Sequence, residues 1–269
     1  MSHTLLDEDI LSNIPSSWIT STVKDVFDIP SGKTPSGIDK HEQSGNIPFF
    51  KVADMNHPEN NPLMRISKIN FTPNELSKLK LTPFPTGTII FPKRGGAIKT
   101  NKKRILAQPS CFDLNIMGLT SNVIPFKYTY YWIYGLDLNK ISDGSNVPQI
   151  NLGNIQPLVF PLPPLDEQNR IVLKIEEHFS KIEATENYLK KIVTILDNKS
   201  TSIDSFGTVI QNVNQIHKLK LSVLKQAFSG KLVSQNSDDE SVDILLENIR
   251  QDKKQLLQNK KSPRKIRND

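Results

Sequence analysis

The sequence is poor in the residues that build metal and redox centres. Among 269 residues there is a single cysteine, Cys111, and there are five scattered histidines. One cysteine cannot close an internal disulfide, and no cysteine–histidine cluster has the spacing of a zinc site. We therefore expect neither a bound metal nor a redox function.

Long apolar runs are also missing. No stretch of the sequence approaches the roughly 20 apolar residues that a membrane-spanning helix needs. The N-terminal segment MSHTLLDEDI is acidic, whereas a secretory signal begins basic and continues apolar. We expect a cytoplasmic protein that does not contact a membrane.

Patterns that carry catalysis are absent as well. The segment SGKTP at 31–35 superficially resembles a phosphate-binding P-loop, but the Gly-x-x-x-x that opens that motif is not there. An enzyme that methylates DNA would require a methyl-donor site and an Asn-Pro-Pro-aromatic phrase, and the sequence has no such phrase. An enzyme that cleaves DNA would require a P-loop or clustered acidic metal ligands, and neither pattern is present in the sequence. The sequence predicts a non-catalytic chain with no catalytic residue, no metal ligand and no cofactor of its own.

The composition is that of a folded, basic protein. Hydrophobic residues make up 36% and charged residues 23%, which is enough apolar material to fill a core. The formal net charge is +6, which favours polyanionic partners but is common among proteins that never contact nucleic acid. The distribution of charge therefore matters more than its total.

The region 1–164 reads as a mixed, strand-rich domain. Short apolar runs alternate with Pro, Gly, Asn and Ser, a pattern typical of strands joined by long loops. The predicted strands are 23–27, 47–52, 88–91, 105–106 and 123–125. Helices are predicted at 73–78, where Thr72 can cap, and at 128–136. The predicted fold class is α+β.

The pattern changes after PLPP at 161–164, where more than thirty residues follow without Pro or Gly. Apolar residues then recur at spacings of three and four, which is typical of a coiled coil and predicts a spacer and dimerisation helix over 165–230. The apolar positions are Val172, Ile175, Phe179, Ile182, Leu189, Val193, Leu196, Ile203, Phe206, Ile210, Val213, Leu221, Leu224 and Phe228. The cluster DNKSTS and Gly207 could break this helix or only loosen it.

An unbroken helix of this length would be near 100 Å long, at about 1.5 Å per residue, and could not be buried inside a protein of this size. Such a helix requires a partner helix. Gly230 is a natural C-terminal cap. The remaining residues, 231–269, form a polar and basic tail in which 244–257 could be a short helix.

The sharpest concentration of positive charge is KRGGAIKTNKKR at 93–104, which contains no acidic residue. If this segment binds DNA, Gly95 and Gly96 would let the backbone approach the duplex closely. Arg94 is the candidate base reader, because a guanidinium can donate two hydrogen bonds to guanine. The lysines would hold phosphates. The same run could instead be a solvated loop in which the glycines only form a turn.

Several phrases, in order along the chain, resemble the specificity subunits of type I restriction-modification systems. The phrases are IPSSWITSTVKDVFDIPSGKTPS at 14–36, IPFFKVADMN at 47–56, GTIIFPKRGGAIKT at 87–100, VPQINLGNIQPLVFPLPPLDEQNRIV at 147–172 and LKQAFSGKLV at 224–233. The resemblance implies a target-recognition domain that reads double-stranded DNA, followed by a spacer.

On this resemblance, the DNA-binding residues fall in three segments. They are Lys93, Arg94, Gly95, Gly96, Lys99, Thr100, Asn101, Lys102, Lys103, Arg104, Lys33, Thr34, Lys51 and Asp54. Lys33 and Thr34 lie in a turn that would border DNA. Lys51 and Asp54 follow a predicted strand and could reach bases, although surface solvation explains them equally well.

The resemblance also implies partners. Methyltransferase subunits that bind S-adenosylmethionine would pack on this chain, and a motor nuclease that uses ATP and Mg could join. Complete members carry two recognition domains and two spacers, whereas this sequence holds one copy of each and no internal repeat. We therefore expect a homodimer, joined through 165–229, that reads an interrupted palindrome.

Three alternatives remain open on the sequence. The chain could be a truncated or silent specificity fragment that assembles with nothing. It could be the specificity component of a system whose methyltransferase and nuclease are fused in one partner. It could also be a general coiled-coil scaffold, which would not need the basic, glycine-containing segment.

Overall fold

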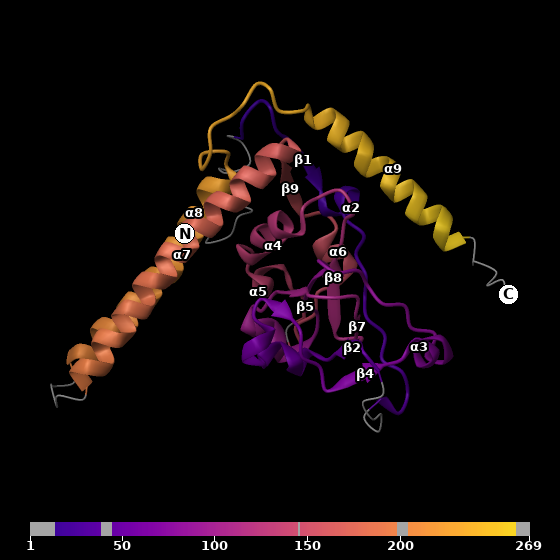
Figure 1. Ribbon diagram of the computed structural model, residues 1–269, viewed down its shortest axis with the longest axis horizontal. Helices are drawn as coiled ribbons and strands as arrows, with labels where there is room; N and C mark the ends of the chain where they lie inside the picture. Colours follow the sequence, from indigo (N-terminus) through magenta and orange to yellow (C-terminus); the bar gives the residue numbers. More distant parts are fainter. Residues whose placement is uncertain (1–13, 39–44, 145, 198–203, 262–269) are drawn as a thin grey trace.

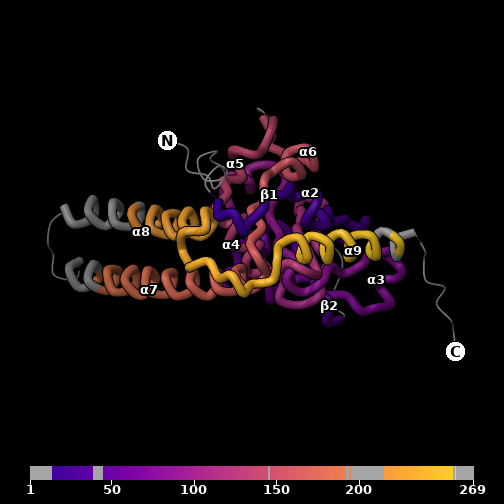
Figure 2. The backbone as a smooth tube through the Cα atoms, turned by 90° about the horizontal axis from the view of Figure 1, so that it is seen from above, coloured from indigo at the N-terminus to yellow at the C-terminus, as the bar shows by residue number. Residues whose placement is uncertain are grey.

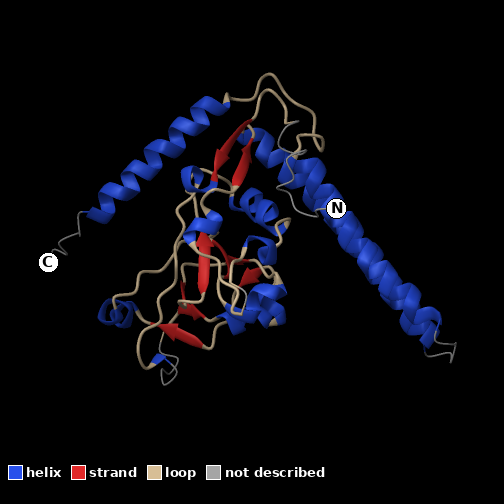
Figure 3. Cartoon of the chain, turned by 180° about the vertical axis from the view of Figure 1, so that it is seen from behind, coloured by secondary structure: helices blue, strands red, loops and turns tan. Residues whose placement is uncertain are grey.

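The computed structural model describes residues 14–38, 45–144, 146–197 and 204–261. A strand-rich body carries two helical arms, a hairpin of long helices and a separate C-terminal helix (Figure 1). The arms diverge from one end of the body, on either side of its strands (Figure 3). The predicted α+β class, with a long helical segment after the strand-rich region, is confirmed.

The strands form three small sheets. β1 (Ile19–Thr22) pairs antiparallel with β9 (Val159–Leu162), so the two ends of the strand-rich region lie side by side. The second sheet has the order β4 (Ile69–Phe71), β2 (Ile47–Phe50), β7 (Cys111–Phe112). The third has the order β3 (Leu63–Met64), β6 (Arg104–Leu106), β5 (Ile89–Pro92), β8 (Ile116–Leu119).

Short helices connect the strands. They are α2 (Val23–Val26), the 3-10 helices η2 (Val52–Asn56), η3 (Pro58–Asn60) and η4 (Gly95–Thr100), and the α-helices α3 (Pro73–Leu79), α4 (Phe126–Tyr134), α5 (Leu138–Ile141) and α6 (Leu152–Ile155). The predicted cap of α3 is confirmed. Thr72 Oγ1 accepts a hydrogen bond from the Glu75 N–H at 3.3 Å, and the Glu75 carboxylate accepts from the Thr72 N–H at 2.7 Å.

Two predicted strands are wrong. Residues 23–26 form α2, because the Thr22 side chain accepts from the Asp25 N–H and starts a helix there. Residues 123–125 lie in the loop before α4. There the Ser121 hydroxyl accepts from the N–H groups of Val123 and Ile124, at 3.2 and 3.1 Å, which competes with pairing in a sheet.

The long helical segment is present as two helices rather than one. α7 (Leu165–Asp197) and α8 (Asp204–Phe228) pack against each other along their length (Figure 2). Residues 198–203, which include most of DNKSTS, lie outside the described residues. Gly207 does not break the helix, since it lies inside α8. The partner helix that the apolar pattern requires is therefore in the same chain.

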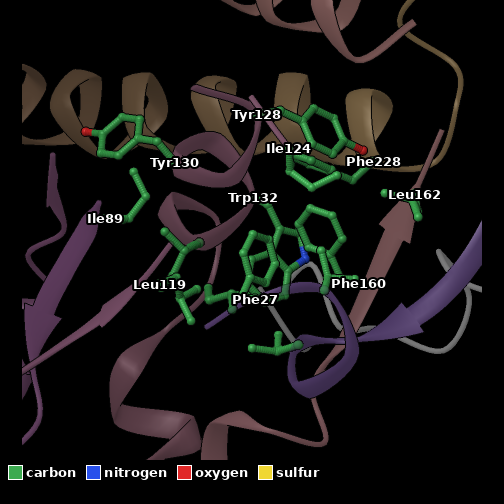
Figure 4. Close-up of a cluster of buried hydrophobic side chains, with 14 of the residues drawn as sticks. Phe27, Ile89, Leu119, Ile124, Tyr128, Tyr130, Trp132, Phe160, Leu162 and Phe228 are labelled. Atoms are coloured by element: carbon green, nitrogen blue, oxygen red, sulfur yellow. The ribbon is translucent and has the colours of Figure 1, made fainter. Parts of the chain in front are cut away.

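The base of the hairpin belongs to the main hydrophobic core. Phe160 of β9 contacts the rings of Phe27, Trp132 and Tyr128, with centroids 4.9, 5.0 and 5.7 Å apart. Tyr128 in turn contacts Phe228 of α8 at 5.2 Å, so one cluster runs from the sheet into the hairpin (Figure 4). The change of pattern at 164 marks a change of secondary structure and not the end of the core.

This packing corrects the role predicted for the apolar helix positions. Those buried in the core are Val172, Ile175, Phe179, Leu224 and Phe228. Ile182, Leu189 and Leu221 are partly buried. The side chains of Val193, Leu196, Ile203, Phe206, Ile210 and Val213 fall outside what the structure describes. The buried positions pack within one chain, so their assignment as dimer contacts is wrong.

The hairpin is tied to the body by a polar junction. The buried Glu167 carboxylate accepts from Trp18 Nε1 at 2.9 Å and from Gln235 Nε2 at 2.7 Å. Burial raises the pKa of Glu167, and these two hydrogen bonds oppose that rise. Arg170 donates two hydrogen bonds to Asp239, at 2.8 and 2.6 Å. Two phrases of the sequence resemblance, 14–36 and 147–172, thus meet at one place through Trp18 and Glu167.

Gly230 ends α8 as predicted. Its φ is +71°, and a Cβ there would lie 2.3 Å from Pro15. The C-terminal helix is longer than expected. α9 (Val242–Lys261) buries Val242, Leu245 and Ile249 in the main core, so its first half is part of the domain and not a tail.

Candidate nucleic-acid interface

The basic segment at 93–102 is held on both flanks. The Lys93 N–H donates to the Asn115 carbonyl at 2.8 Å, and the Lys93 carbonyl accepts from the Ile150 N–H at 2.9 Å. The Gly95 N–H donates to the Pro148 carbonyl at 2.8 Å. The segment is therefore fixed between the turn that follows β7 and the loop that leads into α6.

The SGKTP turn lies beside it. Lys93 Nζ donates to Ser31 Oγ at 2.5 Å, and the Thr34 hydroxyl accepts from the Leu114 N–H at 3.0 Å. Gly32 makes this approach feasible, since a Cβ there would lie 2.0 Å from the Asp113 carbonyl oxygen. The turn fits closely against the residues after β7, which accounts for the need for glycine.

The segment 51–56 completes the surface. Lys102 Nζ donates to the Asn56 side-chain oxygen, and the Asp113 N–H donates to the Phe50 carbonyl at 2.9 Å. The Asp54 carboxylate accepts from the Lys51 N–H at 2.7 Å, and burial raises the pKa of Asp54. Asp54 therefore shapes η2, and any contact with a base remains a prediction.

These contacts bring predicted cations from distant parts of the sequence onto one surface, which we call the basic face. Its cationic members are exposed or half-buried: Lys33, Lys51, Lys93, Arg94, Lys99 and Lys102. Thr34, Gly95, Gly96 and Thr100 lie in the same segments. Gly96 leaves open space where a Cβ would stand, as its predicted role in a close approach of the backbone requires.

Two predicted contacts are wrong. Lys103 and Arg104 are 3% and 9% exposed, so neither can reach a duplex at the surface. Lys103 Nζ donates to the Leu136 carbonyl at 2.6 Å and to the Asn101 side-chain oxygen at 2.7 Å. Burial lowers the pKa of Lys103 to about 7, and the nearby charge of Asp137 opposes that shift. Arg104 donates to the carbonyls of Lys103 and Met55 at 2.8 and 2.9 Å.

Asn101 also has an internal role. Its φ is +53°, in the left-handed region that asparagine tolerates better than most residues. Its side-chain oxygen accepts from the Leu138 N–H at 2.8 Å as well as from Lys103. Asn101, Lys103 and Arg104 thus anchor the C-terminal end of the basic segment to α5 and η2.

The turn at 113–116 was missed in the sequence. The buried Asp113 carboxylate accepts from the Asn115 N–H at 2.9 Å, and the Ile116 N–H donates to the Asp113 carbonyl at 3.1 Å. A signal was available, because the polar residues of DLN stand between the apolar runs CF and IMGL. This turn contacts every other segment of the basic face.

Among the described residues, no cluster of histidine, cysteine, aspartate and glutamate has the arrangement to hold a metal ion. Nor does that part of the chain contain a helix long and apolar enough to cross a membrane.

Comparison with known proteins places the chain in a family. Residues 15–194 match the model of the type I restriction modification DNA specificity domain. The chain is 24% identical over 175 residues to the type I restriction enzyme MjaIX specificity subunit of Methanocaldococcus jannaschii, covering 63% of this chain and 39% of that protein. It is 24% identical over 213 residues to the EcoEI specificity subunit of Escherichia coli, covering 70% and 35%. The chain thus spans well under half the length of these relatives.

Two solved structures are also similar to the chain. The HsdS subunit of Thermoanaerobacter tengcongensis superposes with a TM-score of 0.46 at 19% identity, covering 81% of this chain and 46% of that one. The S subunit of a type I system from M. genitalium gives a TM-score of 0.43 at 15% identity, covering 76% and 50%. On the family match, which extends over most of its length, the chain belongs to the type I restriction modification DNA specificity domain family.

Proposed function

We propose that this chain reads DNA sequence for a type I restriction-modification complex and that the basic face is its reading surface. The observation that carries the proposal is the convergence of cations from separate segments. Lys33, Lys51 and Arg94 are far apart in the sequence but lie on segments joined by direct hydrogen bonds. A surface loop that happened to be basic would not need this bracing.

The cations divide into two roles. The lysines of the basic face would hold phosphates and supply affinity that falls with salt but does not depend on sequence. Arg94 would donate two hydrogen bonds to guanine O6 and N7 in the major groove, which is worth about 1 to 3 kcal/mol of discrimination. The buried anchors keep the loop that carries Arg94 in one conformation.

Catalysis would come from partners. We propose that methyltransferase subunits, which bind S-adenosylmethionine, transfer the methyl group to adenine N6, and that a motor nuclease using ATP and Mg can join. This chain would determine which DNA sequence the complex recognises, and it would act on the cellular DNA in the cytoplasm. The specificity component of a system with a fused methyltransferase-nuclease is the alternative, and the identity of the co-purifying chain separates the two.

A bipartite site would be read by two recognition domains. We propose that two copies associate through their hairpins, as a bundle of coiled-coil type, and read an interrupted palindrome. Because the buried positions of α7 and α8 are already used, the contact would involve outward residues such as Leu173, Tyr188 and Leu219, which are 66%, 65% and 54% exposed. A purified protein that sediments as a monomer at micromolar concentration would contradict this part.

The experiment that tests the function maps methylated adenines in host DNA with and without the gene. Loss of a two-part methylated motif is expected when the gene is removed. A duplex carrying that motif should then bind the purified protein more tightly than a scrambled duplex, across a range of salt concentrations. If the methylation pattern is unchanged and no methyltransferase co-purifies, the chain is a silent fragment and the proposal fails.

A further inference from the structure

The turn at 113–116 lies at the centre of the basic face. The SGKTP turn is hydrogen-bonded to this turn and to the residue before it, since the N–H groups of Gly32 and Lys33 donate to the carbonyls of Ile116 and Phe112, each at 3.1 Å. It also accepts from the Lys93 N–H through Asn115. The Leu114 N–H in turn donates to the Thr34 hydroxyl. The turn is thus fixed by both neighbouring segments.

This rigid turn directs one apolar side chain outward. Phe112 and Ile116 are 1% and 0% exposed and pack in the core cluster beneath the turn. Leu114 between them is 43% exposed. A branched apolar side chain is therefore held in a defined position at the surface, on a turn that is hydrogen-bonded to the segments that carry Thr34 and Lys93.

We propose that Leu114 reads thymine through contact with its C5-methyl group; this inference rests on the proposed function. The cations of the basic face can hold phosphates or donate to guanine, but a thymine methyl is recognised by an apolar contact. A side chain on a braced turn can make that contact reproducibly, which discrimination between bases requires.

Leu114 is also well placed relative to Arg94. Asn115 follows Leu114 and accepts from the backbone of Lys93, which precedes Arg94. The two side chains are therefore displayed from neighbouring, hydrogen-bonded segments. Arg94 would read guanine, and Leu114 would read a thymine close to it, within one half-site.

The test uses duplexes that carry the mapped motif. Each thymine is replaced in turn by deoxyuridine, which lacks only the C5-methyl group. At one position the full-length wild-type protein should lose about fourfold in affinity, the size expected for one buried methyl contact. Leu114→Ala should bind the thymine duplex more weakly by a similar factor and should no longer distinguish thymine from uracil at that position.

The matched control is Leu152→Ala. Leu152 is 46% exposed but lies on α6, in a groove it shares with Leu246 and Arg250 of α9. This variant should keep the wild-type response to uracil. The uracil series on the wild-type protein needs no substitution, so equal affinity for every uracil duplex would overturn the inference even if Leu114→Ala folds poorly.

Two results would overturn the inference: equal wild-type affinity for every uracil duplex, or a Leu114→Ala variant that still distinguishes thymine from uracil at the sensitive position. Failure of the proposed function looks different. In that case the wild-type protein does not distinguish the motif from a scrambled duplex at all.

Discussion

The ammonium group of Lys103 donates a hydrogen bond to the side-chain oxygen of Asn101 at 2.7 Å, beneath the C-terminal end of the basic segment. Asn101 also connects the segment to α5, because the same oxygen accepts a hydrogen bond from the Leu138 N–H. The two residues read from the sequence as DNA contacts, yet together they hold the segment that carries Arg94 against the body of the domain.

Lys103 should make stability depend on pH. In the unfolded chain its amine stays protonated to about pH 10.4, whereas in the folded protein burial lowers the pKa to about 7. Between these values the unfolded state binds more protons, so the free energy of unfolding should rise with pH, by roughly 2 kcal/mol from pH 7 to pH 9. Urea unfolding at each pH measures this.

Lys103→Met should remove that rise, because no ionisable amine is left at the position. Lys99→Met is the control, since Lys99 lies exposed on the same segment, and its unfolding should keep the wild-type pH profile. Equal slopes for Lys103→Met and the wild type would show that the buried amine is not the source.

Arg94→Ala should reduce specificity without affecting stability. Arg94 is exposed, and losing two hydrogen bonds to guanine should lower affinity for the cognate duplex by about 1 to 3 kcal/mol. The affinity for scrambled DNA should fall only by the contribution of one phosphate contact. Fluorescence anisotropy with both duplexes measures the ratio. Lys78→Ala, an exposed cation on α3, should leave the ratio unchanged; an equal loss on both duplexes for Arg94→Ala would make it a phosphate contact instead.

Gly32→Ala should disturb the basic face from within. An added Cβ would lie 2.0 Å from the Asp113 carbonyl, and backbone cannot move aside cheaply, so we expect a loss of about 1 to 3 kcal/mol. Gly96→Ala meets open space and should unfold like the wild type. Chemical denaturation of the two variants provides the comparison, and equal stability would mean that the turns are not packed as described.

The sequence predicts those elements whose signals are local. Thr72 and Glu75 specify the start of α3 within four positions, and Gly230 specifies the end of α8. Whether a lysine lies at the surface or in the core is not determined by its neighbours in the sequence. Lys102 and Lys103 are adjacent and chemically identical, but only Lys103 donates to the Leu136 carbonyl, which the fold brings close from the connection between α4 and α5. The turn at 113–116 was missed for a similar reason, since its importance comes from the segments that surround it.

Pairing of α7 with α8 within one chain was equally hidden. Apolar residues at spacings of three and four indicate that a helix needs a partner but do not say which helix supplies it. The Tyr128–Phe228 contact answers that question for the base of the hairpin, since it ties α8 to the body of the same chain.

Phe228→Ala should therefore destabilise the whole domain. The ring is fully buried against Tyr128, and its removal should cost about 3 to 5 kcal/mol. Because one core spans body and hairpin, helical circular dichroism and tryptophan fluorescence should report the same unfolding midpoint. Lys218→Ala, at an exposed position of α8, should be close to neutral. Separate transitions for the two signals would mean that the hairpin folds independently.

The closed pairing of α7 with α8 changes what association of two such chains would involve. A lone amphipathic rod would have to order itself while joining its twin, and assembly would then depend on protein concentration in the way that coupled folding does. A hairpin whose two helices are already paired would bind a second hairpin without further folding. Substitutions inside its seam would then alter the melting temperature of each chain, and only substitutions on its outer side would alter the affinity between chains.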